Sequence, residues 1–283
     1  MSSKASVIIP TCGRAGILQK NLERILACSP APGEILVQID ASDVGTATML
    51  EKNFAGRVAW EQSEETTGPG GGRKLLIQRA KNPVVVSFDD DSWPEDGDFF
   101  ARAVDRIARH PNAAVLACSV RVKGSARDSR AQVVRSRASF ENCGCVMRRE
   151  AFGQISGYVP LRYAYGMEEL DVALQLLDRG WSIRYAPDLR VYHDTEMNHH
   201  PSAEGNAAQI TNTALLAFLR YPASLWPLGV AQTFNRVRYA LSVGRFRGIA
   251  KGLAAIPFAF WKYRGKREPV KKQTVELARR LRK

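Results

Sequence analysis

Residues 84–96 read VVVSFDDDSWPED, and this stretch decides both the fold and the site that we expect. Three valines and a phenylalanine within five residues are typical of a strand that is buried on both faces of a parallel sheet. Three consecutive aspartates, Asp89, Asp90 and Asp91, follow directly. Because ligands bind beyond the carboxyl ends of the strands in such sheets, the aspartates mark a candidate site at that edge.

Two interpretations of the aspartates are open. Adjacent carboxylates repel one another, and a hard divalent cation would relieve that repulsion. Mg²⁺ or Mn²⁺ takes oxygen ligands and usually shares its shell with substrate phosphates. Asp89 and Asp91 would point the same way if the strand continued. The alternative is a solvated turn, in which residues 91–94 cap the next helix.

The segments around this strand predict an α/β fold with a mostly parallel sheet flanked by helices. Short apolar runs predict strands, and apolar residues at a helical period predict helices. The expected strands are residues 5–10, 33–40, 57–60, 83–91, 113–122, 182–187 and 190–193. The expected helices are residues 16–29, 73–81, 98–110 and 167–180. Pro10, Thr11 and Asp40 then lie at strand ends and join the aspartates at one crevice.

Charge is distributed unevenly along the 283 residues. Residues 220–283 carry 16 Lys or Arg and 2 acidic residues, a net charge of +14. Residues 1–219 hold the other 25 basic and 26 acidic residues, a net charge of −1. The basic character therefore belongs to the C-terminal segment 220–283. From about residue 206 onward, a pattern of helices with interspersed aromatic residues replaces the α/β pattern.

Composition also excludes some classes of protein. No apolar run approaches the ~18–20 residues that span a bilayer, and the N-terminus reaches Pro10 too early for a signal peptide. The five cysteines lack the spacing of a disulfide framework, and Cys143-Gly-Cys145 lacks the second ligand pair of a zinc site. We therefore expect reduced thiols and a cytoplasmic protein that is not integral to a membrane.

Three further motifs are ambiguous when taken singly. GPGGGRK (68–74) permits close backbone approach to a ligand, and Arg73 could hold phosphate oxygens, but residues 66–73 also suit a flexible loop. Glu168 and Glu169 open a predicted helix, either as ordinary first-turn acids or as a general base facing a pocket. His193 ends a predicted strand and is either structural or a metal ligand.

The order and spacing of these motifs resemble family 2 glycosyltransferases with the GT-A fold, which is Rossmann-like. The resemblance covers roughly residues 5–194 and rests on SVIIPTCGR, ILVQIDAS, GPGGGRK, VVVSFDDDSWP, CGCVMRREAFGQISGY, YGMEELDVALQLLDRGW and APDLRVYHD. Two later segments, ITNTALLAFLRYP and RYALSVGRFRGIAKGL, look like the helical tail of polysaccharide-assembling members. The resemblance implies a GT-A catalytic domain over residues 1–205 and a helical, basic C-terminal region over residues 206–283.

The implied activity is transfer of a sugar, with inversion, from a nucleoside diphosphate donor (a UDP-, dTDP- or GDP-sugar) to an acceptor hydroxyl. A glycan or a lipid-linked molecule is the expected acceptor, in the assembly of a cell-surface polysaccharide or glycolipid. Mn²⁺ or Mg²⁺ is the implied cofactor.

The resemblance also implies roles for single residues. Nucleotide binding is implied for Pro10, Thr11, Arg14, Asp40, Arg73, Asp89 and Asp90. Asp89 and Asp91 match the metal-binding D-x-D motif, and His193 matches a histidine that often completes the metal shell.

Two positions depart from the family pattern. Glu168 and Glu169 stand where the family usually has Glu-Asp, whose second member is the base. We therefore expect Glu169 to be the base, with Glu168 as the alternative. The run DASDVGT (40–46) replaces the family's Asp-(Asn/Asp)-Gly-Ser run, so Asp43 could share the role of Asp40.

The basic segment 220–283 interleaves aromatic residues with Lys and Arg. This pattern favours peripheral attachment to an anionic membrane, here the inner face of the cell membrane. A helical subdomain with a solvated basic face is the alternative, and nucleic acid is not expected. The competing class of function is a non-catalytic basic module on a degenerate transferase scaffold, binding membranes or nucleic acid. Substrate specificity is expected around residues 141–145 and 195–205, and the sequence leaves the oligomeric state open.

Overall fold

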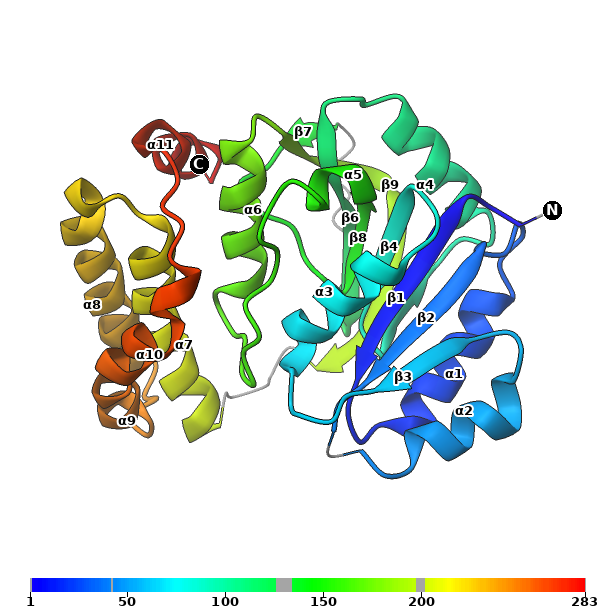
Figure 1. The fold of residues 1–283 in the computed structure, drawn as a ribbon, viewed down its shortest axis with the longest axis horizontal. Coiled ribbons are helices and arrows are strands. Elements are labelled where there is room, and N and C mark those ends of the chain that lie inside the picture. Colours follow the sequence, from blue (N-terminus) through cyan, green and yellow to red (C-terminus); the bar gives the residue numbers. More distant parts are fainter. Residues whose placement is uncertain (1, 42, 126–133, 197–201, 283) are drawn as a thin grey trace.

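A nine-stranded sheet forms the centre of the computed structural model, which describes residues 2–41, 43–125, 134–196 and 202–282 (Figure 1). The strand order is β3-β2-β1-β4-β8-β6-β9-β5, and β7 pairs with β9. The strands are β1 Ala5–Thr11, β2 Glu34–Ile39, β3 Ala59–Gln62, β4 Val84–Phe88, β5 Ser92–Pro94, β6 Ala113–Lys123, β7 Arg135–Ser136, β8 Gly144–Arg148 and β9 Ser182–Glu196.

Most strands run in one direction, which confirms the predicted α/β fold with a mostly parallel sheet. β1 to β4, β6 and β9 are parallel to one another, whereas β5, β7 and β8 run against them. β4 is buried at every residue, as its valines predicted. The two strands predicted at 182–187 and 190–193 are one strand, β9, because β6 pairs with both parts across a register shift. His193 therefore lies within a strand and not at its end.

Helices cover both faces of the sheet, because side chains of a strand alternate between its two faces. In β1, Val7 and Ile9 pack under α1, α2 and α4, whereas Ile8 packs under α3, α5 and α6. These helices are α1 Ala15–Leu26, α2 Thr46–Phe54, α3 Gly68–Arg79, α4 Phe99–Ala108, α5 Arg149–Phe152 and α6 Glu168–Asp178. The predicted helices over 16–29, 98–110 and 167–180 are confirmed within two or three residues at each end.

The glycine-rich stretch 66–73 is not the predicted loop, since α3 begins at Gly68 and includes the glycines. A Cβ added to Gly68 would lie 2.0 Å from the carbonyl oxygen of Leu161, and one added to Gly72 would lie 3.2 Å from Cβ of Pro10. Glycine inside a helix costs about 0.5–1 kcal/mol relative to alanine. That cost is offset by the close approach of α3 to β1 and to the chain around Leu161, which a larger residue would prevent.

The C-terminal helices form a third layer against α6 (Figure 1). They are α7 Ala203–Arg220, α8 Trp226–Ser242, α9 Ile249–Ala254, α10 Ile256–Tyr263 and α11 Lys272–Leu281. Leu174 and Leu177 of α6 share one apolar cluster with Leu215 of α7 and Val275 of α11. The helical C-terminal region is thus present, and the domain boundary at residue 205 stays a prediction. Within the described residues, every helix is too short or too polar to cross a bilayer.

Candidate active site

A cleft of about 1130 Å³ opens where β1, β2 and β4 end and where α3 and α6 begin. Every residue predicted for the site lines this cleft: Pro10, Thr11, Arg14, Asp40, Arg73, Asp89, Asp90, Asp91, Glu168, Glu169 and His193. The structure therefore brings together residues that are up to 183 positions apart, which is the distance from Pro10 to His193 in the sequence.

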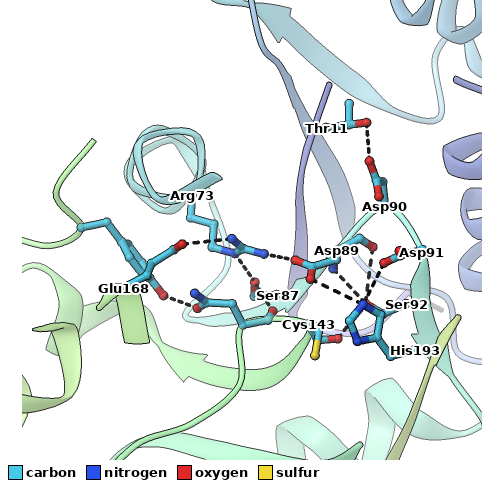
Figure 2. A network of polar contacts seen from close by, with 12 residues as sticks. Thr11, Arg73, Ser87, Asp89, Asp90, Asp91, Ser92, Cys143, Glu168 and His193 are labelled. Atoms are coloured by element: carbon cyan, nitrogen blue, oxygen red, sulfur yellow. Dashed lines mark hydrogen bonds and ion pairs between the residues drawn. The ribbon is translucent and has the colours of Figure 1, made fainter. Parts of the chain in front are cut away.

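The carboxylate of Asp90 forms hydrogen bonds with Thr11, the last residue of β1, and with Arg14 in the loop that follows (Figure 2). Thr11 Oγ1 donates to Asp90 Oδ2 at 2.8 Å, and Arg14 Nη1 lies 2.6 Å from Asp90 Oδ1. Burial raises the pKa of Asp90 to about 6, although Arg14 and Thr11 act in the opposite direction. The other terminal nitrogen of Arg14 pairs with Asp91 Oδ2 at 2.7 Å. Arg14 thus supplies part of the positive charge that the aspartates require.

Asp89, Asp91 and His193 converge in the cleft, as predicted (Figure 2). His193 Nε2 lies 3.0 Å from Asp91 Oδ1 and 3.8 Å from Asp89 Oδ2. Burial lowers the pKa of His193, but the two carboxylates outweigh it and the net shift is upward. Burial raises the pKa of Asp91, but His193 and Arg14 outweigh it and bring the value to about 2. The aspartates do not form the alternative helix-capping turn, because Ser92–Pro94 pairs with β9 as strand β5.

Cys143 belongs to the same cluster and was missed in the sequence. One ligand atom each of Asp89, Cys143 and His193 lie within 4.8 Å of one another. The only local signal is the spacing Cys143-Gly-Cys145, which does not indicate that Asp89 and His193, from distant segments of the chain, lie beside Cys143. A metal bound by Asp89 and His193 would therefore have a sulfur atom in reach.

Arg73 lies between the aspartates and α6, and its side chain is only 2% exposed. Its guanidinium donates to Ser87 Oγ at 3.1 Å and to Glu168 Oε1 at 3.1 Å, and forms an ion pair with Asp89 (Figure 2). Burial lowers the pKa of Arg73, but the carboxylates of Asp89 and Glu168 outweigh it and raise the pKa overall. Arg73 is thus a permanent cation that links the two acidic parts of the cleft.

The two glutamates at the start of α6 have different surroundings. Glu168 is buried and its carboxylate pairs with Arg73. Glu169 is half-buried and makes no ion pair among the described residues, and the backbone N–H of Asn142 donates to it. Burial is the largest cause that raises the pKa of each carboxyl, against the opposing charge of Arg73. Glu169 is therefore the glutamate whose carboxylate is more available to a bound molecule.

Asp40 and Asp43 also differ. Asp40 Oδ2 accepts from the N–H of Gly68 at 3.1 Å, while its Oδ1 is buried and has no hydrogen-bond partner in the described part of the chain. Asp43 accepts from the N–H groups of Gly13 at 2.7 Å and Thr46 at 3.1 Å, and it is not among the residues that line the cleft. These bonds lower the pKa of Asp43 although burial opposes them. Asp43 organises its own loop, whereas Asp40 lines the cleft.

Several further polar residues, to which the sequence assigned no individual role, also line the cleft, among them Gln38, Lys123, Asn142 and Arg162. Asn142 falls in the segment 141–145 that was predicted to bear on specificity. Of the other predicted segment, 195–205, residues 197–201 lie outside the described residues.

Comparison with known proteins supports the same class of fold. A model of the family described as Glycosyl transferase family 2 matches residues 6–164. No sequence among curated proteins matches the chain. A mannosyltransferase of Pyrobaculum calidifontis, PcManGT, solved with GDP-Man and Mn²⁺, has a TM-score of 0.60 at 14% identity, and the match covers 100% of this chain and 87% of that one.

Two other solved structures are similar. TarS 1-349 of S. aureus, in complex with UDP-GlcNAc, has a TM-score of 0.62 at 16% identity, covering 100% of this chain and 88% of that chain. GalNAc-T7, solved with UDP, GalNAc and Mn²⁺, has a TM-score of 0.62 at 14% identity, covering 87% of this chain but only 58% of that one. At these identities the likeness shows the fold, and it confirms the expected GT-A architecture.

Proposed function

Because the chain belongs to glycosyl transferase family 2, we propose that it transfers a sugar from a nucleoside diphosphate donor to an acceptor hydroxyl. The observation that carries this proposal is one cleft in which two acidic sites face a common space. Asp89, Asp91 and His193 form the first site, and Glu169 the second. The similar structures of PcManGT and TarS hold GDP-Man and UDP-GlcNAc, which supports a nucleotide sugar as the donor.

The first acidic site fits a divalent cation. Asp91 Oδ1 is buried and accepts no well-aligned hydrogen bond among the described residues, although it lies 3.0 Å from His193 Nε2. Asp89, Asp91 and His193 would hold Mn²⁺ or Mg²⁺, and PcManGT and GalNAc-T7 were solved with Mn²⁺. When bound, such an ion stabilises the negative charge of a departing nucleoside diphosphate.

Glu169 is the proposed general base. It removes the proton of the acceptor hydroxyl while that oxygen bonds to the anomeric carbon, and the bond to the diphosphate breaks on the opposite side. Attack from the opposite side inverts the anomeric centre. Glu168 is less suited to this role, because its carboxylate is buried against Arg73. Arg73 in turn positions both Glu168 and Asp89.

Nucleotide recognition is proposed for the ends of β1 and β2. The buried Oδ1 of Asp40, which has no hydrogen-bond partner among the described residues, can accept from a ring N–H of the base. Uracil, thymine and guanine all carry such a group, so this contact is compatible with UDP-, dTDP- and GDP-sugars alike. Pro10, Thr11 and Arg14 line the same part of the cleft.

We expect the protein to bind a nucleoside diphosphate tightly only with Mn²⁺ or Mg²⁺ present, and to lose this dependence when Asp91 is changed to Asn. Removing a ligand oxygen should weaken metal binding by about tenfold or more. Thermal shifts with UDP, dTDP and GDP, each with Mn²⁺ or EDTA, measure this directly. Asp105→Asn is the matched control, since Asp105 is half-exposed on α4. Full sugar transfer by the wild-type protein in EDTA would show that the metal has no role.

We also propose that the C-terminal helices attach the protein to an anionic membrane and so bring it to a lipid-linked acceptor. Val230 and Phe234 of α8 are 71% and 67% exposed, and Phe258 and Trp261 of α10 are 62% and 61% exposed. Exposed aromatic side chains on a segment of net charge +14 suit the interface of an anionic bilayer.

The expected result for Phe234→Glu combined with Phe258→Glu is at least about 100-fold weaker binding to vesicles that contain phosphatidylglycerol. Each substitution removes an apolar side chain whose burial is favourable by about 1.5–3 kcal/mol. Co-sedimentation with vesicles measures the loss, and Val44→Glu is the control because Val44 is 93% exposed in the α/β part. Point variants are preferable to deletion of residues 220–283, because α10 and α11 share an apolar cluster with α6. Vesicle binding without any nucleotide binding would favour the competing, non-catalytic class of function.

A further inference from the structure

The pairing of four strands, β4 with β8 and β5 with β9, places Cys143 beside the proposed metal ligands. β4 and β8 are antiparallel, with Phe88 opposite Gly144, so the next residues outward are Asp89 and Cys143. β5 and β9 are antiparallel as well, with Ser92 opposite His193. The strand register, and not the local sequence, therefore brings a carboxylate, a thiol and an imidazole to one point.

Ser92 fixes this arrangement through hydrogen bonds. Its Oγ accepts from the backbone N–H of Asp89 at 2.8 Å and donates to the backbone carbonyl of Cys143 at 2.7 Å. Ser92 itself is fully buried. The backbones that carry the carboxylate and the thiol are therefore held together by a third residue, which is how rigid metal sites are built.

Cys143 also differs from the other buried cysteines. Cys118 and Cys145 lie inside the two apolar clusters of the sheet, where they pack as small apolar residues. Cys143 is 9% exposed and belongs to neither cluster, nor to the apolar cluster of the C-terminal helices. Ligand atoms of Asp89 and His193 lie within 4.8 Å of one another and of its sulfur. Asp91 Oδ1, 3.0 Å from His193 Nε2, is buried and has no well-aligned hydrogen bond among the described residues.

We propose that Cys143 is a ligand of the metal at this site and biases it toward ions that accept sulfur. This inference rests on the proposed function, since it concerns the metal site assigned there. Sulfur is a soft ligand that favours Zn²⁺ and Co²⁺, whereas Mg²⁺ prefers oxygen ligands only. The thiol proton leaves to the solvent when the sulfur binds the ion. The site then ranks Zn²⁺ and Co²⁺ above Mn²⁺, and Mn²⁺ above Mg²⁺.

Cobalt is the direct probe, because a sulfur ligand gives Co²⁺ a charge-transfer absorption in the near ultraviolet that oxygen and nitrogen ligands do not give. The full-length protein with Co²⁺ should show this absorption, and Cys143→Ser should lose it. Cys145→Ala and Cys12→Ser are matched controls that should keep it, since Cys145 is buried in β8 two residues after Cys143 and Cys12 lines the same cleft. In competition with a chromophoric chelator, Cys143→Ser should bind Zn²⁺ at least about tenfold more weakly, with Mg²⁺ affinity unchanged.

The outcomes separate this inference from the proposed function. The unfolding temperature of Cys143→Ser is the control for folding. If it equals that of the wild-type protein, a loss of the absorption reflects the loss of the sulfur ligand and not unfolding. The role of Cys143 is overturned if the wild-type protein binds Co²⁺ without the sulfur absorption, or if Cys143→Ser shows the same absorption. In either case, metal-dependent sugar transfer by the wild-type protein would still support the proposed function. If the wild-type protein binds neither Co²⁺ nor Mn²⁺, with or without UDP or GDP, the inference and the proposed metal site are both wrong.

Discussion

Glu169→Gln is expected to lower kcat for sugar transfer by about 10²–10⁴-fold, the usual contribution of a general base. The amide keeps the shape of the side chain and can still take the hydrogen bond from the N–H of Asn142, but it cannot remove a proton. Donor and metal affinity should be unchanged, because Asp89, Asp91 and His193 are not altered. Isothermal titration with nucleotide and single-turnover transfer assays separate the two effects.

The pH dependence of transfer gives a second measurement on the same residue. Burial raises the pKa of Glu169, so the unprotonated base is gained only as the pH rises through that raised value. Transfer by the wild-type protein should therefore increase with pH above the range of an ordinary carboxylate, and the Gln variant should lack this increase. A Glu169→Gln enzyme that transfers sugar at the wild-type rate would exclude Glu169 as the base.

Glu168→Gln is the informative comparison, because it removes the charge that faces a buried Arg73. Arg73 would then keep its ion pair with Asp89 only, so we expect a loss of thermal stability that Glu169→Gln does not share. A large loss of kcat at unchanged stability in Glu168→Gln, together with an active Glu169→Gln enzyme, would instead assign the base to Glu168.

The order of motifs carried most of the information that could be obtained from the sequence. Strand ends are marked locally, by Pro10 after VII, by Asp40 after LVQI and by Asp89 after VVVSF. In a mostly parallel sheet these ends meet at one edge, so local signals are enough to predict a shared cleft. That is why Pro10, Asp40 and Asp89 do line one cavity.

The features that were missed depend on contacts between distant segments. The glycines from Gly68 onward look like a loop in the sequence, whereas in the structure they belong to α3, where Gly68 permits close approach to Leu161. β8 was not among the predicted strands, and its register with β4 is what brings Cys143 to Asp89. Neither packing distance nor antiparallel register can be read from local periodicity.

Arg220 shows that the sequence also does not reveal which charged residues are buried. In the sequence it counts toward the basic C-terminal segment, whereas in the structure it is 1% exposed and pairs with Asp171, which is also 1% exposed. Two further bonds hold its guanidinium, to Ser156 Oγ and to the carbonyl of Glu268, both at 3.3 Å. The net charge of a segment therefore overstates the charge that it presents to solvent.

Breaking this pair is expected to have the largest effect on stability. Asp171→Asn or Arg220→Met should each lower the free energy of unfolding by about 3–5 kcal/mol, because each removes the buried partner of a buried charge. In Asp171→Asn, Arg220 retains only the half-exposed Glu268, whose Oε2 lies 3.7 Å from its Nη1. Asp171 lies within the first turns of α6, which also carries Glu169, and Arg220 ends α7. The pair therefore fixes the helix of the proposed base against the C-terminal helices. Urea denaturation measures the loss, and Asp105→Asn, in a half-exposed pair with Arg109, should cost less than about 1 kcal/mol.

The double variant Asp171→Leu with Arg220→Met tests whether the loss comes from an unpaired charge. Apolar residues in place of both partners often restore the stability of a buried pair, because no charge is left uncompensated. Gln175, which donates to Asp171 Oδ2 at 3.2 Å, would still donate to the carbonyl of Gly157 at 3.1 Å, so no amide is stranded. The double variant should thus unfold at higher urea than either single variant. If all three lose the same stability, packing at this contact, and not charge pairing, holds α6 against α7.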